Sequence, residues 1–188
     1  MQRTHEATKK RRDSLPLQAP PHIPRTLALS VALALALLAA ACSRAESETI
    51  EELEASGAVP KLDRTDSLTG TDADQNGVRD DIDAFITREY PLEPQRKAAL
   101  QTARALQKTL LVEPGDVPSA KAAAREDARA CNCVYRQFPS GGTKEAAQVG
   151  SELESLTANT KQRLLALLRT SKTLDGTSWA LPTGDTCE

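Results

Sequence analysis

Residues 71–91 read TDADQNGVRDDIDAFITREYP, an acidic loop that runs directly into an amphipathic segment. In the second half, apolar side chains recur at i, i+3, i+4 and i+8, the stripe of one helix face; they are Ile82, Phe85, Ile86 and Tyr90. Pro91 and Pro94 interrupt this pattern, because proline cannot continue a helix interior. The stretch therefore predicts a short helix that leaves an acidic loop and ends before residue 91.

Three longer helices are predicted beyond this stretch. The first covers about 93–112 and places four apolar residues on one face, namely Ala99, Ala103, Leu106 and Leu110. The second covers about 119–138 and is ended by the sequence PSGG. The third covers about 144–172 and carries six apolar residues, namely Val149, Leu153, Leu156, Leu164, Leu167 and Leu168.

The predicted fold class is therefore mainly α. No stretch shows the two-residue alternation of a half-buried strand. We expect a small domain of about four helices over residues 61–188, with the acidic loop before the first helix. The last twelve residues, TSWALPTGDTCE, are expected to form an extended arm, with Trp179 and Leu181 packed beneath it. The core is rich in alanine and leucine, so a covalent cross-link would help to stabilise it.

The twelve residues from Asp72 to Asp83 have the spacing of a calcium-binding loop. Carboxylates or amides stand at positions 1, 3, 5, 9 and 12, and Gly77 stands at position 6, where the chain must turn sharply. The expected ligands are the side-chain oxygens of Asp72, Asp74, Asn76, Asp80 and Asp83 and the backbone carbonyl of Val78. Five aspartates in the loop would repel one another without a counter-ion, and an Asx turn that caps the helix would explain only one or two of them.

Two positions depart from an EF-hand: Asp83 stands where glutamate is usual, and Arg79 stands where an apolar residue is usual. No helical stripe precedes the loop. The pattern D-x-D-x-N-G-x-x-D-x-x-D resembles the calcium loops of thrombospondin type 3 repeats, and it is similar to single loops in uncharacterised bacterial lipoproteins. The resemblance implies calcium binding and no particular activity. Asp81 is expected to face solvent at the helix start, where the helix dipole favours a negative charge.

The N-terminal part of the chain predicts export. The cluster KKRR (9–12) precedes an uncharged apolar run that ends in small residues, as in a secretory signal peptide over residues 1–41. The sequence LLAAAC (37–42) resembles the lipobox of bacterial lipoproteins, which implies a lipid on Cys42; Ser43 favours the outer membrane. A plain secreted protein cleaved near Ala41 is the alternative. Residues 42–60 are acidic and predict a flexible tether, with a short helix possible near 48–55.

Three cysteines follow Cys42, and an exported protein is expected to form one disulfide from them. On the predicted helix Cys131 shares a face with Tyr135 and Phe138, whereas Cys133 lies on the opposite, charged face. We expect a Cys133–Cys187 disulfide with Cys131 buried, and Cys131–Cys187 is the alternative pairing.

Composition excludes several classes of function. Of the 24 basic and 26 acidic residues, six and two fall within residues 1–41, so the processed chain has a net charge of −6 and is a poor partner for nucleic acid. Both histidines, His5 and His22, also lie there. The processed chain therefore has no Ser-His-Asp or Cys-His pair and no histidine-ligated zinc.

These observations predict a calcium-binding, lipid-anchored protein of the cell envelope, facing the periplasm, with a structural or partner-binding role and no catalysis. Its expected partners are the lipid membrane, through Cys42, and an envelope protein. One alternative is a periplasmic inhibitor or adaptor of a secreted enzyme. Another is a hydrolase that uses paired carboxylates, although the loop aspartates are unavailable as acid and base if they ligate metal.

Overall fold

Six α-helices and no strand are present in the residues that the structure describes. The structure is a computed structural model, and it describes residues 48–178, 180 and 182–188. The helices are α2 (Ile50–Ser56), α3 (Asp80–Glu89), α4 (Glu93–Leu110), α5 (Val117–Gln137), α6 (Ala146–Thr157) and α7 (Lys161–Thr173). All of them belong to one compact unit, Thr49–Glu188. The predicted mainly α class is therefore confirmed.

Capping side chains mark the starts of α5, α6 and α7, whereas the N-cap residues of α3 and α4 make no side-chain hydrogen bond. The side chain of Asp116 accepts a hydrogen bond from the backbone N–H of Ser119 and so caps α5. Glu145 and Gln148 form a reciprocal capping box at the start of α6. Thr160 caps α7 through the backbone N–H of Arg163. These side chains satisfy N–H groups that have no partner inside the helix.

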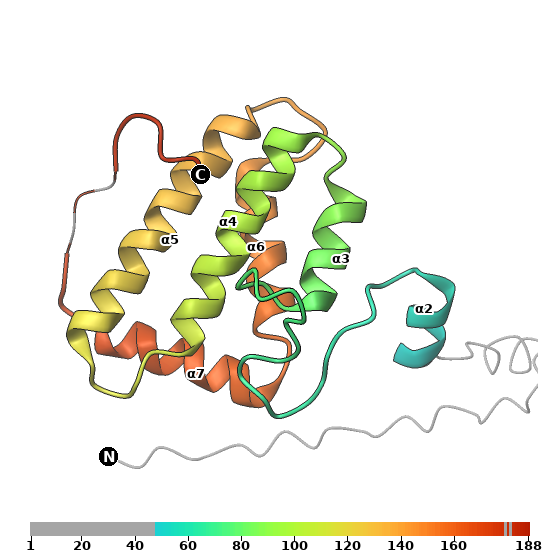
Figure 1. The fold of residues 1–188 in the computed structure, drawn as a ribbon, viewed down its shortest axis with the longest axis horizontal. Helices are drawn as coiled ribbons and strands as arrows, with labels where there is room; N and C mark the ends of the chain where they lie inside the picture. The colour runs from blue at the N-terminus through green and yellow to red at the C-terminus, as the bar shows by residue number, and fades with distance from the viewer. Residues whose placement is uncertain (1–47, 179, 181) are drawn as a thin grey trace, which may run out of the picture. The chain divides into compact units, whose positions relative to one another are not determined.

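The last predicted helix is wrong as a single element. Residues 144–172 form two helices, because α6 ends at the Ala158 cap and Thr160 starts α7. In Figure 1, α7 crosses the ends of α4 and α5 instead of continuing along α6. The change of direction turns Leu164 and Leu168 outward, with 46% and 54% of their surfaces exposed. Ala166 and the side chain of Arg163 are buried in their place.

Helix α4 occupies the centre of the unit and contacts α3, α5, α6 and α7. Its predicted apolar face is confirmed, since Ala99, Ala103, Leu106 and Leu110 are all buried. Small residues are frequent on the buried faces of α4 and α5; the buried alanines are Ala98, Ala99, Ala103, Ala105, Ala120, Ala123 and Ala130. Such residues allow two helices to approach closely but supply little apolar area each.

Aromatic side chains close the end of the core next to α3. The predicted stripe of α3 is confirmed, because Ile82, Phe85, Ile86 and Tyr90 are all buried. The Tyr90 ring lies edge-on to Phe85, with centroids 6.5 Å apart, and edge-on to Phe138, with centroids 5.5 Å apart. Edge-to-face pairs of this kind are favourable beyond the area that they bury.

The disulfide joins Cys133 to Cys187, which confirms the predicted pairing. The burial predicted for the two helical cysteines is reversed: Cys133 is 1% exposed and Cys131 is the exposed free thiol. The reason is that Ala130, Cys133 and Val134 form the buried face of α5, whereas Tyr135 is 59% exposed.

The C-terminal residues lie against α4 and α5 through hydrogen bonds as well as the disulfide. The side chain of Gln101 donates to the carbonyl of Thr186 over 2.9 Å. The hydroxyl of Thr186 donates to the carbonyl of Arg129 over 2.6 Å, and Asn132 donates to the carbonyl of Gly184. Trp179 and Leu181, which we expected to pack beneath this segment, lie outside the described residues.

The signal peptide and Cys42 also lie outside the described residues. Within the segment predicted as a tether, α2 forms behind a capping box of Thr49 and Glu52 and ends at Gly57. None of its residues is buried. No helix in residues 48–178 has the length and apolar character needed to cross a membrane.

Candidate metal centre

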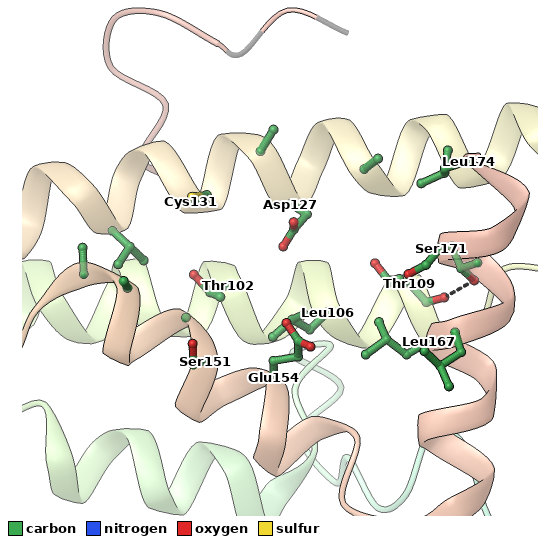
Figure 2. Close-up of a pocket in the computed structure, with 18 of the residues that line it drawn as sticks. Thr102, Leu106, Thr109, Asp127, Cys131, Ser151, Glu154, Leu167, Ser171 and Leu174 are labelled. Atoms are coloured by element: carbon green, nitrogen blue, oxygen red, sulfur yellow. Dashed lines mark hydrogen bonds between the residues drawn. The ribbon is translucent and has the colours of Figure 1, made fainter. Parts of the chain in front are cut away.

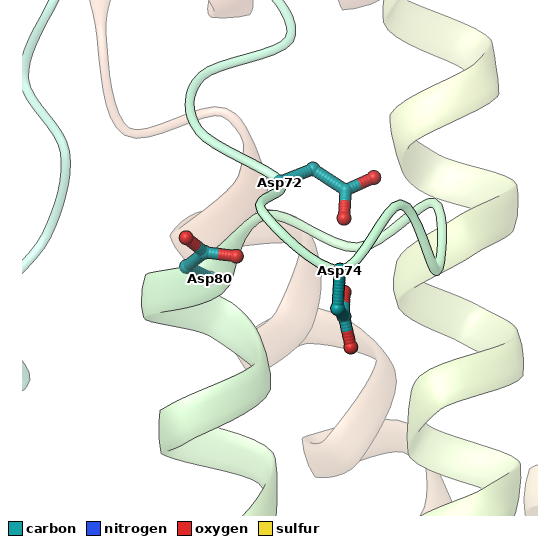
Figure 3. Close-up of side chains that lie close together, drawn as sticks. All are labelled: Asp72, Asp74 and Asp80. Carbon is teal, nitrogen blue, oxygen red and sulfur yellow. The ribbon is translucent and has the colours of Figure 1, made fainter.

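Three of the predicted ligands converge beside the start of α3. Asp72 and Asp74 come from the loop and Asp80 from the first turn of the helix, as Figure 3 shows. One carboxylate oxygen from each lies within 4.8 Å of the others. That separation allows a single cation to contact all three carboxylates. The group is therefore a possible metal site, and its geometry leaves the type of ion open.

The loop reaches this shape because its backbone N–H groups turn toward the first aspartate. The two carboxylate oxygens of Asp72 accept hydrogen bonds from the N–H groups of Asn76, over 3.1 Å, and Gly77, over 2.9 Å. Gly77 has a φ of +79°, which favours glycine because it carries no Cβ. Gln75 also adopts a positive φ, 59°. The chain therefore wraps around the Asp72 carboxylate.

A second set of bonds ties the loop to the helix. The N–H of Asp80 donates to the carbonyl of Thr71 over 2.8 Å, and the carboxylate of Asp80 accepts from the N–H of Ala73 over 2.9 Å. Asp80 thus belongs to both the loop and α3. Its position at the helix N-terminus also favours a negative charge.

The other predicted ligands are placed differently. Asp83 is not in the group of three; its carboxylate accepts a hydrogen bond from the Asn76 amide over 2.7 Å, and the same amide donates to Asp74 over 3.0 Å. The Asn76 amide oxygen accepts from the N–H of Val78 over 2.8 Å. The side chain of Val78 is buried in the core. For Asn76 to bind a cation through oxygen, its amide would have to rotate.

Arg79 is the residue whose role the sequence did not reveal. It is 1% exposed, and its guanidinium forms a two-point ion pair with the carboxylate of Asp81. The same group donates to the carbonyls of Leu156 and Thr157, the last two residues of α6. Carbonyls at a helix C-terminus have no partner inside the helix and carry partial negative charge. Arg79 therefore connects the loop to the end of α6.

The expectation that Asp81 faces solvent is wrong. Its side chain is only 13% exposed, because the buried guanidinium of Arg79 holds it against the protein. The second oxygen of the same carboxylate accepts a hydrogen bond from the N–H of Asp63 over 2.6 Å. Gly70 permits this arrangement, since a Cβ at residue 70 would lie 2.2 Å from Cδ of Arg79.

A second arginine, Arg163 of α7, lies fully buried beside this pair. Its guanidinium donates to the carbonyl of Asp63 over 2.6 Å and to the side chain of Asn159 over 2.8 Å. Burial lowers the pKa of Arg163, and the nearby charge of Arg79 adds to this effect. Hydrogen bonds from Thr65 lower the pKa of Asp63, and Arg163 and Arg79 lower it further. We call Asp63, Arg79, Asp81 and Arg163 the arginine cluster.

The acidic loop therefore contributes Asp72, Asp74 and Asp80 to the possible metal site and Arg79 and Asp81 to the arginine cluster. The sequence signal that could have identified the cluster is the arginine at position 8 of the loop, which departs from the apolar residue of an EF-hand.

The chain matches no protein-family model, and neither a curated protein nor a solved structure shows detectable similarity to it.

Proposed function

We propose that this protein is a calcium-binding, lipid-anchored protein of the cell envelope with a structural or partner-binding role. The observation that carries the metal part is the convergence of Asp72, Asp74 and Asp80 around one point. The support for export and anchoring is the basic cluster, the apolar run and Cys42 at the N-terminus.

Calcium fits the loop better than the other common divalent cations. The donor atoms available are carboxylate, amide and carbonyl oxygens, which are hard ligands, and the processed chain has no histidine. Calcium accepts six to eight oxygens in flexible geometry, whereas magnesium demands a near-ideal octahedron. A short loop that brings only three carboxylates together suits the less demanding ion.

The bound ion would stabilise the fold through Arg79. Neutralising the three carboxylates would fix the loop, and the loop positions Arg79 against the last carbonyls of α6. An affinity typical of extracellular modules, Kd of about 10⁻⁴–10⁻³ M, suits such a structural ion. At about 10 mM calcium this affinity corresponds to about 1.4–2.7 kcal/mol of added stability.

Calorimetric melting of residues 43–188 with calcium and with chelator tests the proposal. We expect calcium to raise the melting temperature and magnesium to raise it less. Asp74→Ala should abolish the calcium response. Asp66→Ala is the matched control, because Asp66 is an exposed aspartate just upstream of the loop; this variant should respond as the wild type does. An equal melting temperature with and without 10 mM calcium would refute the metal proposal.

Anchoring is tested separately, in the full-length chain. Metabolic labelling with a palmitate analogue should mark the wild type and leave Cys42→Ala unlabelled. Fractionation should then place the labelled protein in the outer membrane. A wild type that carries no label and is recovered without membrane would support the plain secreted alternative.

A further inference from the structure

A large open groove lies on the side of the unit away from α3. It has a volume of about 640 Å³ and is bounded by α5, α6 and α7, with α4 as its floor. Its apolar lining includes Leu106, Ala128, Val134, Leu167, Leu168 and Leu174. This volume falls within the usual range for small-molecule sites, which are mostly apolar with a few placed polar groups.

Two carboxylates face each other across this groove. Figure 2 shows Asp127 of α5 and Glu154 of α6 pointing into the same space from opposite sides. Neither carboxylate accepts a hydrogen bond or forms an ion pair with another side chain in the described part of the chain. No lysine, arginine or histidine is among the residues that line the groove.

The threonine hydroxyls of the groove donate to backbone carbonyls and not to these carboxylates. Thr102 and Thr109 donate to carbonyls of their own helix, those of Ala98 and Ala105. Thr170 donates to the carbonyl of Thr109 over 2.9 Å, the bond drawn as a dashed line in Figure 2. These three donors are already used. The hydroxyls of Ser151, Ser171 and Tyr135 also line the groove, but the charged groups in its lining are the two carboxylates.

Burial raises the pKa of Asp127, and the negative charge of Glu154 adds to this effect. Holding an unpaired carboxylate in such a place is unfavourable for the free protein. A cation that enters the groove would relieve both the lost solvation and the repulsion. Its non-polar body would at the same time cover Leu168, which is 54% exposed.

We propose that the groove between α5, α6 and α7 binds a small amphipathic organic cation, an ammonium group carried on an aliphatic or aromatic body. The ammonium group lies between Asp127 and Glu154, and the apolar body lies against the leucines of α7. This proposal is independent of the metal site, because the two sites share no residue.

The test uses dodecyltrimethylammonium below its micelle concentration, titrated into residues 43–188 and followed by amide NMR shifts and calorimetry. We expect saturable 1:1 binding with shifts confined to α4–α7. Dodecyl sulfate has the same tail and tetramethylammonium a similar head group, and neither should bind measurably. Equal binding of the sulfate, or shifts spread over the whole surface, would overturn the proposal.

Two neighbouring residues supply a matched pair of variants. Asp127→Asn should weaken binding by about tenfold or more, since the Coulombic attraction between the carboxylate and the trimethylammonium group is lost. Glu126→Gln removes the same charge from an exposed position that pairs with Lys108, so its affinity should stay within about twofold. If both variants weaken binding equally, the cation is attracted by the overall negative charge of α5, and the proposed site is refuted.

Gly150 provides a variant that blocks the groove without disturbing the fold. It lies in the middle of α6 and lines the groove, and a Cβ placed there meets nothing within 4 Å. Gly150→Leu should abolish binding while the melting temperature stays equal or rises, because leucine favours helix more than glycine does. Unchanged binding would overturn the proposal. A wild type that sediments as a dimer and a Gly150→Leu variant that sediments as a monomer would identify a second copy as the occupant instead.

Discussion

The arginine cluster pairs its carboxylates with arginines, whereas the groove leaves the half-buried Asp127 and the exposed Glu154 without a cationic partner. In the cluster Asp81 binds Arg79 at two points, and Asp63 lies beside Arg163. In the groove Asp127 and Glu154 face each other without a cationic side chain in the lining. The pKa of Asp63 is accordingly lowered, by hydrogen bonds from Thr65 and by the two arginines, and the pKa of Asp127 is raised by burial.

This contrast separates carboxylates that support the fold from carboxylates that are available to a ligand. A paired, hydrogen-bonded carboxylate contributes to stability, and an unpaired one lowers it. Proteins tolerate the second kind where function requires it, because strongly perturbed groups concentrate at functional sites. Variants that remove one member from each region can therefore test the comparison.

The largest loss of stability is expected from Arg79→Met. The variant leaves Asp81 without its partner in a largely buried position and removes the donors to Leu156 and Thr157. Breaking a buried ion pair on one side typically costs about 3–5 kcal/mol. Urea unfolding followed by circular dichroism should show a loss of this size.

The control for this variant is Arg88→Met on α3. Arg88 pairs with Glu89 on the surface, and exposed pairs contribute about 0–1 kcal/mol. The double variant Arg79→Met with Asp81→Leu should recover part of the loss, because no unpaired carboxylate is left. If Arg79→Met and Arg88→Met lose equal stability, the arginine cluster does not support the fold as we describe.

Cys187→Ala is expected to lower the free energy of unfolding by up to about 4 kcal/mol. The disulfide closes a loop of 54 residues. Opening this loop gives the unfolded chain more conformational entropy, which lowers the free energy of unfolding by about 4 kcal/mol. Cys131 is an exposed free thiol at the edge of the groove, so Cys131→Ala should change the free energy of unfolding by less than about 0.5 kcal/mol. Denaturant unfolding under non-reducing conditions measures both; equal losses would contradict the assignment of Cys131 as the free thiol.

Local patterns were sufficient to predict α3, α4 and α5. Their apolar residues recur at helical spacing and prolines or glycines bound them, so the sequence contains the approximate ends of all three helices and the buried faces of α3 and α4. The division between α6 and α7 has weaker signals: no proline or glycine lies between Leu156 and Leu168, and the leucines continue past the break. Only the capping residue Thr160 indicates it, and threonine is also common in helices that continue.

The buried face of α5 was predicted wrongly because the two aromatic residues near its end differ: Phe138 is buried and Tyr135 is 59% exposed. Tyr135 suggested the buried side, whereas the close contact with α4 requires alanines such as Ala123 and Ala130. The disulfide pairing was nevertheless correct, since only Cys133 points toward the C-terminal segment.

In the candidate site, too, the local part was predicted from the sequence and the long-range contacts were not. The spacing of Asp72, Asp74 and Asp80 predicted the acidic group, because those ligands belong to one local loop. The bonds of Arg79 reach residues 77 and 78 positions away, and the two groove carboxylates lie on different helices. Contacts of that kind follow from how the helices pack, which single-sequence patterns do not specify.

The smallest change in the free energy of unfolding is expected from Asp127→Asn, and it is an increase instead of a loss. Between the ordinary pKa of 3.8 and its raised value, the folded state binds more protons at Asp127 than the unfolded state does. Stability therefore falls as the pH rises through that interval. The groups that face Asp127 are Glu154 on α6 and the thiol of Cys131 on its own helix; the lining residues from α4 and α7 are neutral.

Asparagine at position 127 removes this titration and keeps the shape of the side chain. The variant should be more stable than the wild type at pH 7, and the difference should shrink toward pH 4, where the wild-type carboxylate is increasingly protonated. Melting curves of both proteins at several pH values measure the difference, with Glu126→Gln reporting the general effect of removing a charge from α5. A variant that is less stable at pH 7 would mean that Asp127 supports the fold, as Asp81 does, and the groove would lose the property that distinguishes it from the arginine cluster.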